Sequence, residues 1–182
     1  GPLALDPPPA ADPPRTPPMP DPILRRLGPE DVDAAEAVLR AAFEDYARRL
    51  GREQAPGSTR ASDALAKGGR VLALAPPGDP ARLLAVATLH PAPELAPAGA
   101  WLLGHLGVAP AGWGRGLGAR LLAAAEAEAR GAGAARLALV TAAMRDDLVG
   151  FYARRGFAEA WRGPPAHGLD PHERVRLEKP LA

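Results

Sequence analysis

The chain has 182 residues, a formal net charge of +1 at pH 7 and no cysteine. This length suffices for one domain with one hydrophobic core, and the missing cysteines exclude disulfides, a thiol nucleophile and cysteine-ligated metals. The balanced charge does not favour a nucleic-acid partner, the histidines show no paired metal-ligand spacing, and no apolar run reaches the ~18 residues that a membrane span needs.

The N-terminal segment is rich in proline. Residues 1–22 contain ten of the chain's 23 prolines and few large apolar side chains. Such a segment cannot bury enough surface to offset the entropy of ordering, so we expect disorder over 1–22 and a single domain over 23–182. Gly1-Pro2 resembles the scar of a tag-cleaving protease, and Met19 is a candidate native start. Because no signal-like apolar core is present, we expect a cytoplasmic protein.

The first part of the expected domain predicts a strand followed by two helices. The strand covers 23–27, and Pro29 begins a helix whose apolar residues keep helical spacing to about Tyr46. Proline is favoured at this position because the first turn of a helix does not use its N–H. The second helix is predicted over 62–67, with Ser62 as its N-terminal cap and a glycine pair at its end.

The middle of the chain predicts mainly strands. Runs rich in Leu, Val and Ala indicate three of them, at 70–75, 82–90 and 101–108. The first two are joined by a Pro-Pro-Gly-Asp-Pro turn, and the third follows a proline-rich loop over 91–99.

The third of these strands leads into a glycine-rich turn. Glycine occupies every second position from Gly112 to Gly118, and the helical segment ARLLAAAEAEAR follows directly. The first turn of a helix has N–H groups without internal partners and a partial positive charge, so it attracts phosphate. Glycine lets the backbone approach such a ligand closely. The pattern therefore predicts an anion-binding loop.

Two familiar nucleotide-binding loops fit this turn poorly. A P-loop requires a lysine, and the segment has none. Gly114, Gly116 and Ala119 satisfy the G-x-G-x-x-A pattern of a dinucleotide fold. However, the next predicted strand, 136–140, ends at Thr141 without the acidic residue that would hold the ribose. A nicotinamide-dinucleotide binder, or a turn that binds nothing, remains as an alternative.

Downstream of that strand lies the segment DDLVGFYARRGF, residues 146–157. It predicts a short helix that carries Phe151 and Tyr152 on one face and ends before Gly156. Another strand follows directly, and a last strand, 174–178, is expected at the edge of the sheet.

This succession resembles the GNAT superfamily of N-acetyltransferases. Residues 113–118 match its pyrophosphate loop, Gln/Arg-x-x-Gly-x-Gly/Ala, and residues 151–157 match its (F/L)-Y-x-x-x-G-F element. The resemblance is specific over 101–157 and only topological before that. It implies an α/β fold (α+β in some schemes) with a mixed, mostly antiparallel sheet of about six or seven strands, about four flanking helices, and a splayed parallel strand pair at the acyl-CoA site.

For function, the resemblance implies an acyltransferase that uses acetyl-CoA to acetylate a primary amine of a small molecule or peptide by direct attack. It implies no metal, and it leaves a homodimer open. The backbone at Leu106, Gly107 and Val108 would pair with the pantetheine arm. The loop residues would hold the pyrophosphate; they are Trp113, Gly114, Arg115, Gly116, Leu117, Gly118 and Ala119.

Three positions depart from the family's pattern. Trp113 stands where the family usually has Gln or Arg, so a side-chain contact is lost there. Arg145 stands where many members carry an Asn that touches the pantetheine arm. Gly104 takes the place of a Glu that often serves as general base. Because the Glu and Asn are missing, a non-catalytic acyl-CoA-binding module of the same fold remains the alternative function.

The resemblance also implies catalytic candidates. Tyr152 matches the family tyrosine that protonates the leaving CoA thiolate, although a core tyrosine would show the same pattern. His105 is adjacent to the missing Glu, but strand alternation places its side chain on the opposite face unless a bulge turns it inward. The general base and the acceptor therefore stay open. Further candidates lie on segments that form the acceptor side in this fold, namely Glu44, Tyr46, His90 and Glu94.

Overall fold

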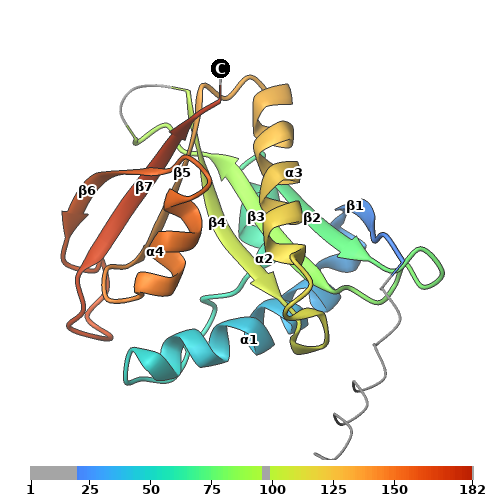
Figure 1. Ribbon diagram of the computed structural model, residues 1–182, viewed down its shortest axis with the longest axis horizontal. Helices are drawn as coiled ribbons and strands as arrows, with labels where there is room; N and C mark the ends of the chain where they lie inside the picture. Colours follow the sequence, from blue (N-terminus) through green and yellow to red (C-terminus); the bar gives the residue numbers. More distant parts are fainter. Residues whose placement is uncertain (1–19, 96–98, 182) are drawn as a thin grey trace, which may run out of the picture.

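The computed structural model describes residues 20–95 and 99–181, which form one seven-stranded sheet with helices on both faces (Figure 1). The disorder expected for the proline-rich N-terminus lies, up to residue 19, outside the described residues. The strand order is β1-β2-β3-β4-β5-β7-β6, and β4 and β5 are the parallel pair. The strands are β1 (Ile23–Leu27), β2 (Arg70–Ala75), β3 (Ala85–Pro91), β4 (Ala100–Val108), β5 (Arg136–Ala142), β6 (Ala158–Gly163) and β7 (Arg174–Pro180).

The helices divide between the two faces of this sheet. Their bounds are α1 (Val32–Arg49), α2 (Ala61–Ala66), α3 (Leu117–Gly131) and α4 (Asp146–Ala153). Residues of α1 and α2 pack into one apolar cluster with β2 and β3, whereas α3 and α4 pack into a second cluster on the opposite face. The expected mixed α/β architecture is thus confirmed. None of the helices among the described residues is both long and apolar enough to cross a membrane.

Apolar spacing explains how α3 lies on the sheet. Leu117, Leu121, Leu122, Ala125 and Ala129 are buried, and this spacing places them on one helical face. Two of these side chains are alanines, which let the helix pack closely over β3 and β4 (Figure 1). The N-terminus of α3 is thereby fixed at the end of β4.

The position of the last strand was predicted wrongly. β7 lies between β5 and β6 instead of at the edge, because its Val175 and Leu177 are buried in the main core cluster. The edge strand at this end of the sheet is β6, whose first five residues are exposed. A strand with buried apolar side chains is more stable inside the sheet than at its rim, because more apolar surface is removed from water there.

Smaller boundary predictions also need correction. Ser62 does not cap α2, which begins at Ala61 after Arg60 and has no side-chain cap, because Ala61 itself is buried in the core. β3 begins at Ala85 and not at residue 82, because the preceding residues belong to the turn, where the Arg82 amide donates to the Asp79 carbonyl. Residues 96–98 of the proline-rich loop lie outside the described part.

Candidate active site

β4 and β5 separate shortly after they meet. They are paired only from Ala100 with Arg136 to Leu102 with Ala138. A first cavity, of about 220 Å³, lies where the strands diverge. Its walls come from both strands, from α1, from the loop between α1 and α2, and from α4. The predicted splayed parallel pair is therefore confirmed, and it opens a space beside the exposed edge of β4.

A β-bulge in β4 positions the side chains of this cavity. Thr88 pairs with His105 and Leu89 pairs with Leu103, so the register skips Gly104. A Cβ on Gly104 would lie only 3.0 Å from the Thr88 hydroxyl oxygen. The extra residue shifts the alternation of the strand, and His105 lines the first cavity. The bulge that the sequence analysis named as the condition for this placement is present.

His105 is held through both ring nitrogens. Its Nε2 lies 2.7 Å from the Ser58 carbonyl oxygen, which can only accept, so Nε2 carries the proton. Its Nδ1 lies 2.8 Å from Thr88 Oγ1 and accepts from that hydroxyl in the neutral ring. Burial lowers the pKa of His105, and the hydrogen bond to Ser58 opposes this shift only in part. The ring is neutral at pH 7, with its lone pair at Nδ1.

Tyr152 borders the same cavity from α4. Its side chain packs edge-to-face against Phe151 and Phe157, with ring centroids 5.1 and 5.5 Å apart. The residue is only 8 % exposed, and this burial raises the pKa of its phenol. The hydroxyl therefore stays protonated throughout the neutral pH range. A buried phenol in this state can donate a proton but cannot act as a base.

Tyr46 of α1 joins this helix to the end of β5. Its hydroxyl accepts a hydrogen bond from the Ala142 amide at 3.0 Å, and the guanidinium of Arg145 lies over its ring. Arg145 donates to both carboxylate oxygens of Asp147 at 3.0 and 2.9 Å, which lowers the pKa of Asp147. Arg145 thus anchors the start of α4, although its Nη1 is buried without a hydrogen-bond partner among the described residues.

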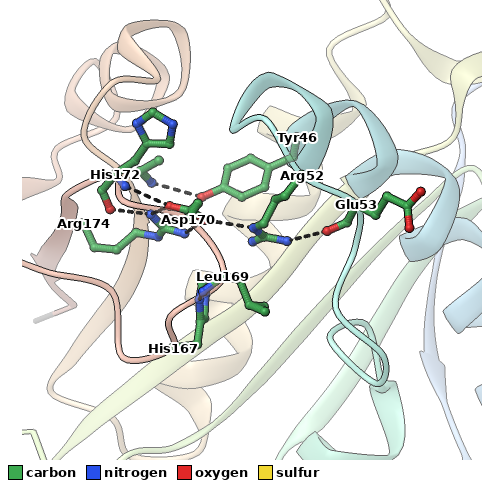
Figure 2. Close-up of polar contacts among 9 residues, drawn as sticks. Tyr46, Arg52, Glu53, His167, Leu169, Asp170, His172 and Arg174 are labelled. Atoms are coloured by element: carbon green, nitrogen blue, oxygen red, sulfur yellow. Dashed lines mark hydrogen bonds and ion pairs between the residues drawn. The ribbon is translucent and has the colours of Figure 1, made fainter.

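An ion cluster ties two loops together beside the first cavity (Figure 2). Asp170, between β6 and β7, accepts hydrogen bonds from Arg174 at 2.9 Å and from Nε of Arg52 at 2.8 Å. Arg52 also donates through Nη1 to the Glu53 carbonyl at 3.0 Å and lines the first cavity. These contacts hold the pKa of Asp170 well below its usual range, chiefly through Arg174. The sequence analysis missed this cluster.

A second cavity, also of about 220 Å³, lies where β4 leads into α3. Gly114 and Gly116 have φ of +75° and +74°, a conformation that favours glycine, and a Cβ on either would meet nothing within 4 Å. The Arg120 amide donates to the Gly116 carbonyl at 3.2 Å and closes the first helical turn. The amides before it have no acceptor in the helix; they belong to Leu117, Gly118 and Ala119. This geometry suits an anion.

The predicted cofactor residues divide among the cavities. Most of them line the second cavity: Val108, Trp113, Gly114, Gly116, Leu117, Gly118 and Ala119. Leu106 lines the first cavity, whereas Gly107, Arg115 and Arg145 line neither. At Gly107 a Cβ would lie 2.9 Å from the Cβ of Ala42, so this glycine allows α1 to pack closely on β4.

Arg155 is the cation at the second cavity that sequence reasoning missed. It lines that cavity, its guanidinium lies 3.8 Å from the ring centroid of Phe151, and its Nη1 donates to the Phe151 carbonyl at 2.8 Å. The signal was its position four residues after Phe151, although Arg155 itself lies in the turn that follows α4. Arg155 is therefore held in place beside the glycine loop.

The candidates for the acceptor side also divide. Tyr46 lines the first cavity, whereas Glu44, His90 and Glu94 line neither cavity. A residue that the sequence analysis did not select, Thr141, does line the first cavity. Its hydroxyl oxygen is buried without a hydrogen-bond partner among the described residues. Within the same residues, no group of three or more His, Cys, Asp or Glu side chains is arranged to hold a metal ion.

The chain is similar to known acetyltransferases in sequence and in structure. The model of the acetyltransferase (GNAT) family matches residues 35–157. The ribosomal-protein-S18-alanine N-acetyltransferase from Escherichia coli is similar in structure, with a TM-score of 0.69 at 18% identity over 88% of this chain and 94% of that one. An N-acetyltransferase from Staphylococcus aureus Mu50 has a TM-score of 0.67 at 16% identity, over 89% and 99%.

A third similar structure contains a ligand. The protein yncA from Salmonella typhimurium, solved with its cofactor acetyl-CoA, has a TM-score of 0.67 at 17% identity over 89% of this chain and 95% of that one. At such identities the structural likeness establishes the fold alone. No curated protein sequence matches the chain significantly.

Proposed function

The chain belongs to the acetyltransferase (GNAT) family, and on this premise we propose that it transfers an acetyl group from acetyl-CoA to a primary amine of a small molecule or peptide. The observation that carries the proposal is that β4 borders both cavities. Val108 lines the anion-type cavity, and Leu106 lines the cavity that holds the protonated phenol of Tyr152. A donor with a pyrophosphate at one end and a thioester at the other matches this arrangement.

The donor would lie along the edge of β4 that β5 leaves. Beyond Leu102 this edge has no pairing to β5, so its N–H and C=O groups are available to the amides of a pantetheine arm. Leu106 and Gly107 belong to this stretch. The carbonyl of Val108 instead accepts the Trp113 indole N–H at 2.8 Å. The pyrophosphate would bind the first amides of α3, and Arg155 would add a positive charge.

The proposed transfer is a direct attack. The acceptor first loses a proton from its ammonium, because only the neutral amine has a free lone pair. The nitrogen then attacks the thioester carbon, the carbonyl electrons move to oxygen, and an N–H of β4 stabilises this oxyanion. The carbon–sulfur bond breaks as the carbonyl re-forms. The thiolate takes the proton of Tyr152, whose phenolate regains one from the amine nitrogen, so that the net products are an amide, free CoA and the proton that the ammonium lost first.

Two residues would move the protons in this scheme. Burial raises the pKa of Tyr152, which keeps its hydroxyl protonated at neutral pH but makes it a weaker acid than a free phenol. Its proton transfer to the thiolate would therefore have to be coupled to the return of the amine proton. His105 would take the first proton at Nδ1 through water, once the Thr88 hydroxyl turns its hydrogen away from that nitrogen. Because the ring is neutral at pH 7, it is in the state that a base requires.

The proposal is tested by binding and turnover together. Acetyl-CoA at about 100 times its dissociation constant is expected to stabilise the fold by ~2.7 kcal/mol, a rise in Tm on the order of 5–10 °C for a chain of this size. A panel of amines, amino acids, aminoglycosides and peptides is then assayed for CoA release. A Tm shift with NAD but none with acetyl-CoA would contradict the donor. A shift without CoA release from any amine would support the non-catalytic binding module instead.

A further inference from the structure

The first cavity has an unusual charge content for a site that receives an amine. Among the described residues that line it, Arg52 is the one with a full charge at pH 7, and no carboxylate is present. An acceptor with several ammonium groups would find no counter-charge on these walls. The lining therefore disfavours polyamines and polycationic peptides.

The charge of Arg52 is not balanced by its own cluster. Asp170 supplies one negative charge for the two guanidinium groups of Arg52 and Arg174, so the cluster carries a net charge of +1. The side chains of Asp170, Arg174 and Arg52 are 1 %, 8 % and 16 % exposed. Figure 2 shows the Glu53 side chain directed away from the cluster, with only its carbonyl oxygen bonded to Arg52. A buried excess charge of this kind is costly unless an anion pairs with it.

The neighbourhood of Arg52 is suited to hold such an anion. Its Nε and Nη1 are engaged by Asp170 and Glu53, which fix the guanidinium and leave Nη2 without a protein acceptor among the described residues. A fixed guanidinium loses little conformational entropy when it binds a carboxylate. The same loop places further polar side chains on the cavity wall, namely Gln54, Ser58 and Thr59.

The remaining walls differ from this polar side. Phe43 and several leucines supply apolar surface, and Tyr152 marks where the thioester would react. The buried hydroxyl of Thr141 has no hydrogen-bond partner in the described part of the chain, and an amine N–H would satisfy it. The cavity thus combines a site for an amine, a site for an anion and apolar surface within about 220 Å³.

We infer that the acceptor is a small amino acid-type molecule whose carboxylate binds Arg52 while its amino group faces the thioester. The inference rests on the proposed acetyl transfer and names its substrate class. It assigns Arg52 as the residue that selects acceptors with an anionic group close to the reacting amine, and the apolar walls as the contact for an uncharged side chain.

The test measures binding independently of turnover. The protein is saturated with CoA, and calorimetry gives the dissociation constants of leucine, methionine and phenylalanine beside those of their carboxamides, which keep the amine but lack the carboxylate. The wild type is expected to bind at least one of the acids about tenfold or more tightly than its carboxamide, the value of one charge-assisted pair. In Arg52→Gln this preference is expected to disappear, and in Arg52→Lys to survive in part.

Arg60→Gln is the matched control, because Arg60 lies on the same loop but lines a separate hollow; it is expected to keep the preference. The inference is overturned if all three carboxamides bind as tightly as the acids, if no acid binds, or if Arg52→Gln keeps the full preference. CoA release is measured separately with the same compounds. Tight, Arg52-dependent binding of the acids without CoA release would overturn the proposed function, while the carboxylate-binding role of Arg52 would stand.

Discussion

The two cavities along β4 are built from different parts of the chain. The second cavity consists largely of backbone, with glycines and helix amides from one continuous stretch of the sequence. The first cavity depends on side chains from several elements, and its ion cluster joins Arg52 to Asp170 across 118 positions. A backbone site leaves a contiguous motif in the sequence, whereas a side-chain site of this kind does not. The contrast predicts different responses to mutation on the two sides.

The largest effect is expected at Tyr152, which lines the first cavity where the thioester would react. Tyr152→Phe keeps the ring packed against Phe151 and Phe157 and removes only the proton donor. A general acid contributes about 10²–10⁴-fold, so kcat is expected to fall by that factor while Tm and acetyl-CoA affinity hardly change. Steady-state kinetics with the best amine of the panel measures this. Full activity of the variant would assign thiolate protonation to water or another residue.

The ion cluster beside the first cavity can be disrupted by neutralising Asp170. Asp170→Asn leaves the buried guanidinium of Arg174 and the partly exposed one of Arg52 without a counter-charge, and removing one partner of a buried ion pair costs about 3–5 kcal/mol. Urea denaturation at pH 7 measures the loss. Glu159→Gln is the control, because its pair with Arg162 is exposed to solvent and contributes little to stability.

Asp170→Asn also predicts how the free energy of unfolding depends on pH. The pKa of Asp170 is lowered in the fold, so its stabilisation is complete above the unfolded value of about 3.9 and is lost as the pH falls below it. The unfolding free energy of the wild type is therefore expected to decline more steeply in acid than that of Asp170→Asn. Parallel curves would show that Asp170 contributes no such linkage.

The second cavity, where the donor's pyrophosphate would bind, can be disrupted by substituting Gly116. Gly116→Glu places a side chain at φ +74° and a negative charge at the first turn of α3. The stabilisation of ~2.7 kcal/mol by acetyl-CoA is expected to vanish. Gly133→Glu is the control, since Gly133 has φ +90° at the other end of the same helix and strains the backbone alike. Equal ligand shifts in the two variants would refute the placement of the pyrophosphate.

A smaller loss of acetyl-CoA affinity is expected from substituting Arg155, whose side chain lines the second cavity. Arg155→Ala is expected to weaken acetyl-CoA binding about tenfold and to reduce the salt dependence of the dissociation constant. The adjacent Arg154 does not line the cavity, so Arg154→Ala is expected to bind normally. If both variants weaken binding equally, the effect is one of net charge and not of a placed cation.

The smallest effect concerns His105 and pH. If His105 takes the amine proton, kcat/KM falls as the pH drops through its pKa, which burial lowers below the usual 6.5. His105→Ala is then expected to remove this acidic limb while acetyl-CoA affinity stays nearly unchanged. An unchanged pH profile of kcat/KM with a lowered Tm would assign His105 a structural role, in which its hydrogen bond to the Ser58 carbonyl holds that loop against β4.

Features set by local sequence patterns could be predicted, whereas features that depend on contacts between distant segments could not. The strand–glycine–helix order and the position of Tyr152 could be predicted, because glycine spacing and helical periodicity are local properties. The order of β6 and β7 could not, since it depends on which strand buries Val175 and Leu177 in a core that the local pattern does not define. The bulge at Gly104 depends equally on how β3 pairs with β4.

The candidate site shows this limit most clearly. Arg145 was a cofactor-binding candidate from its sequence position alone; in the fold its guanidinium binds Asp147 and lies over the Tyr46 ring, and it lines neither cavity. Arg52 and Asp170 gave no sequence signal, because each is an ordinary loop charge until the fold brings them together. Side-chain electrostatics between distant segments is therefore what the sequence alone left out.

The exposed indole of Trp113 has an optical consequence. It is 58 % exposed where it lines the second cavity, and its N–H donates a hydrogen bond to the Val108 carbonyl. Indole emission shifts and quenches when its solvent contact changes, so Trp113 acts as an intrinsic fluorophore beside the ligand. Trp101 is buried in the core, and Trp161→Phe removes the other exposed indole. In that background, donor binding can be followed in real time without a label.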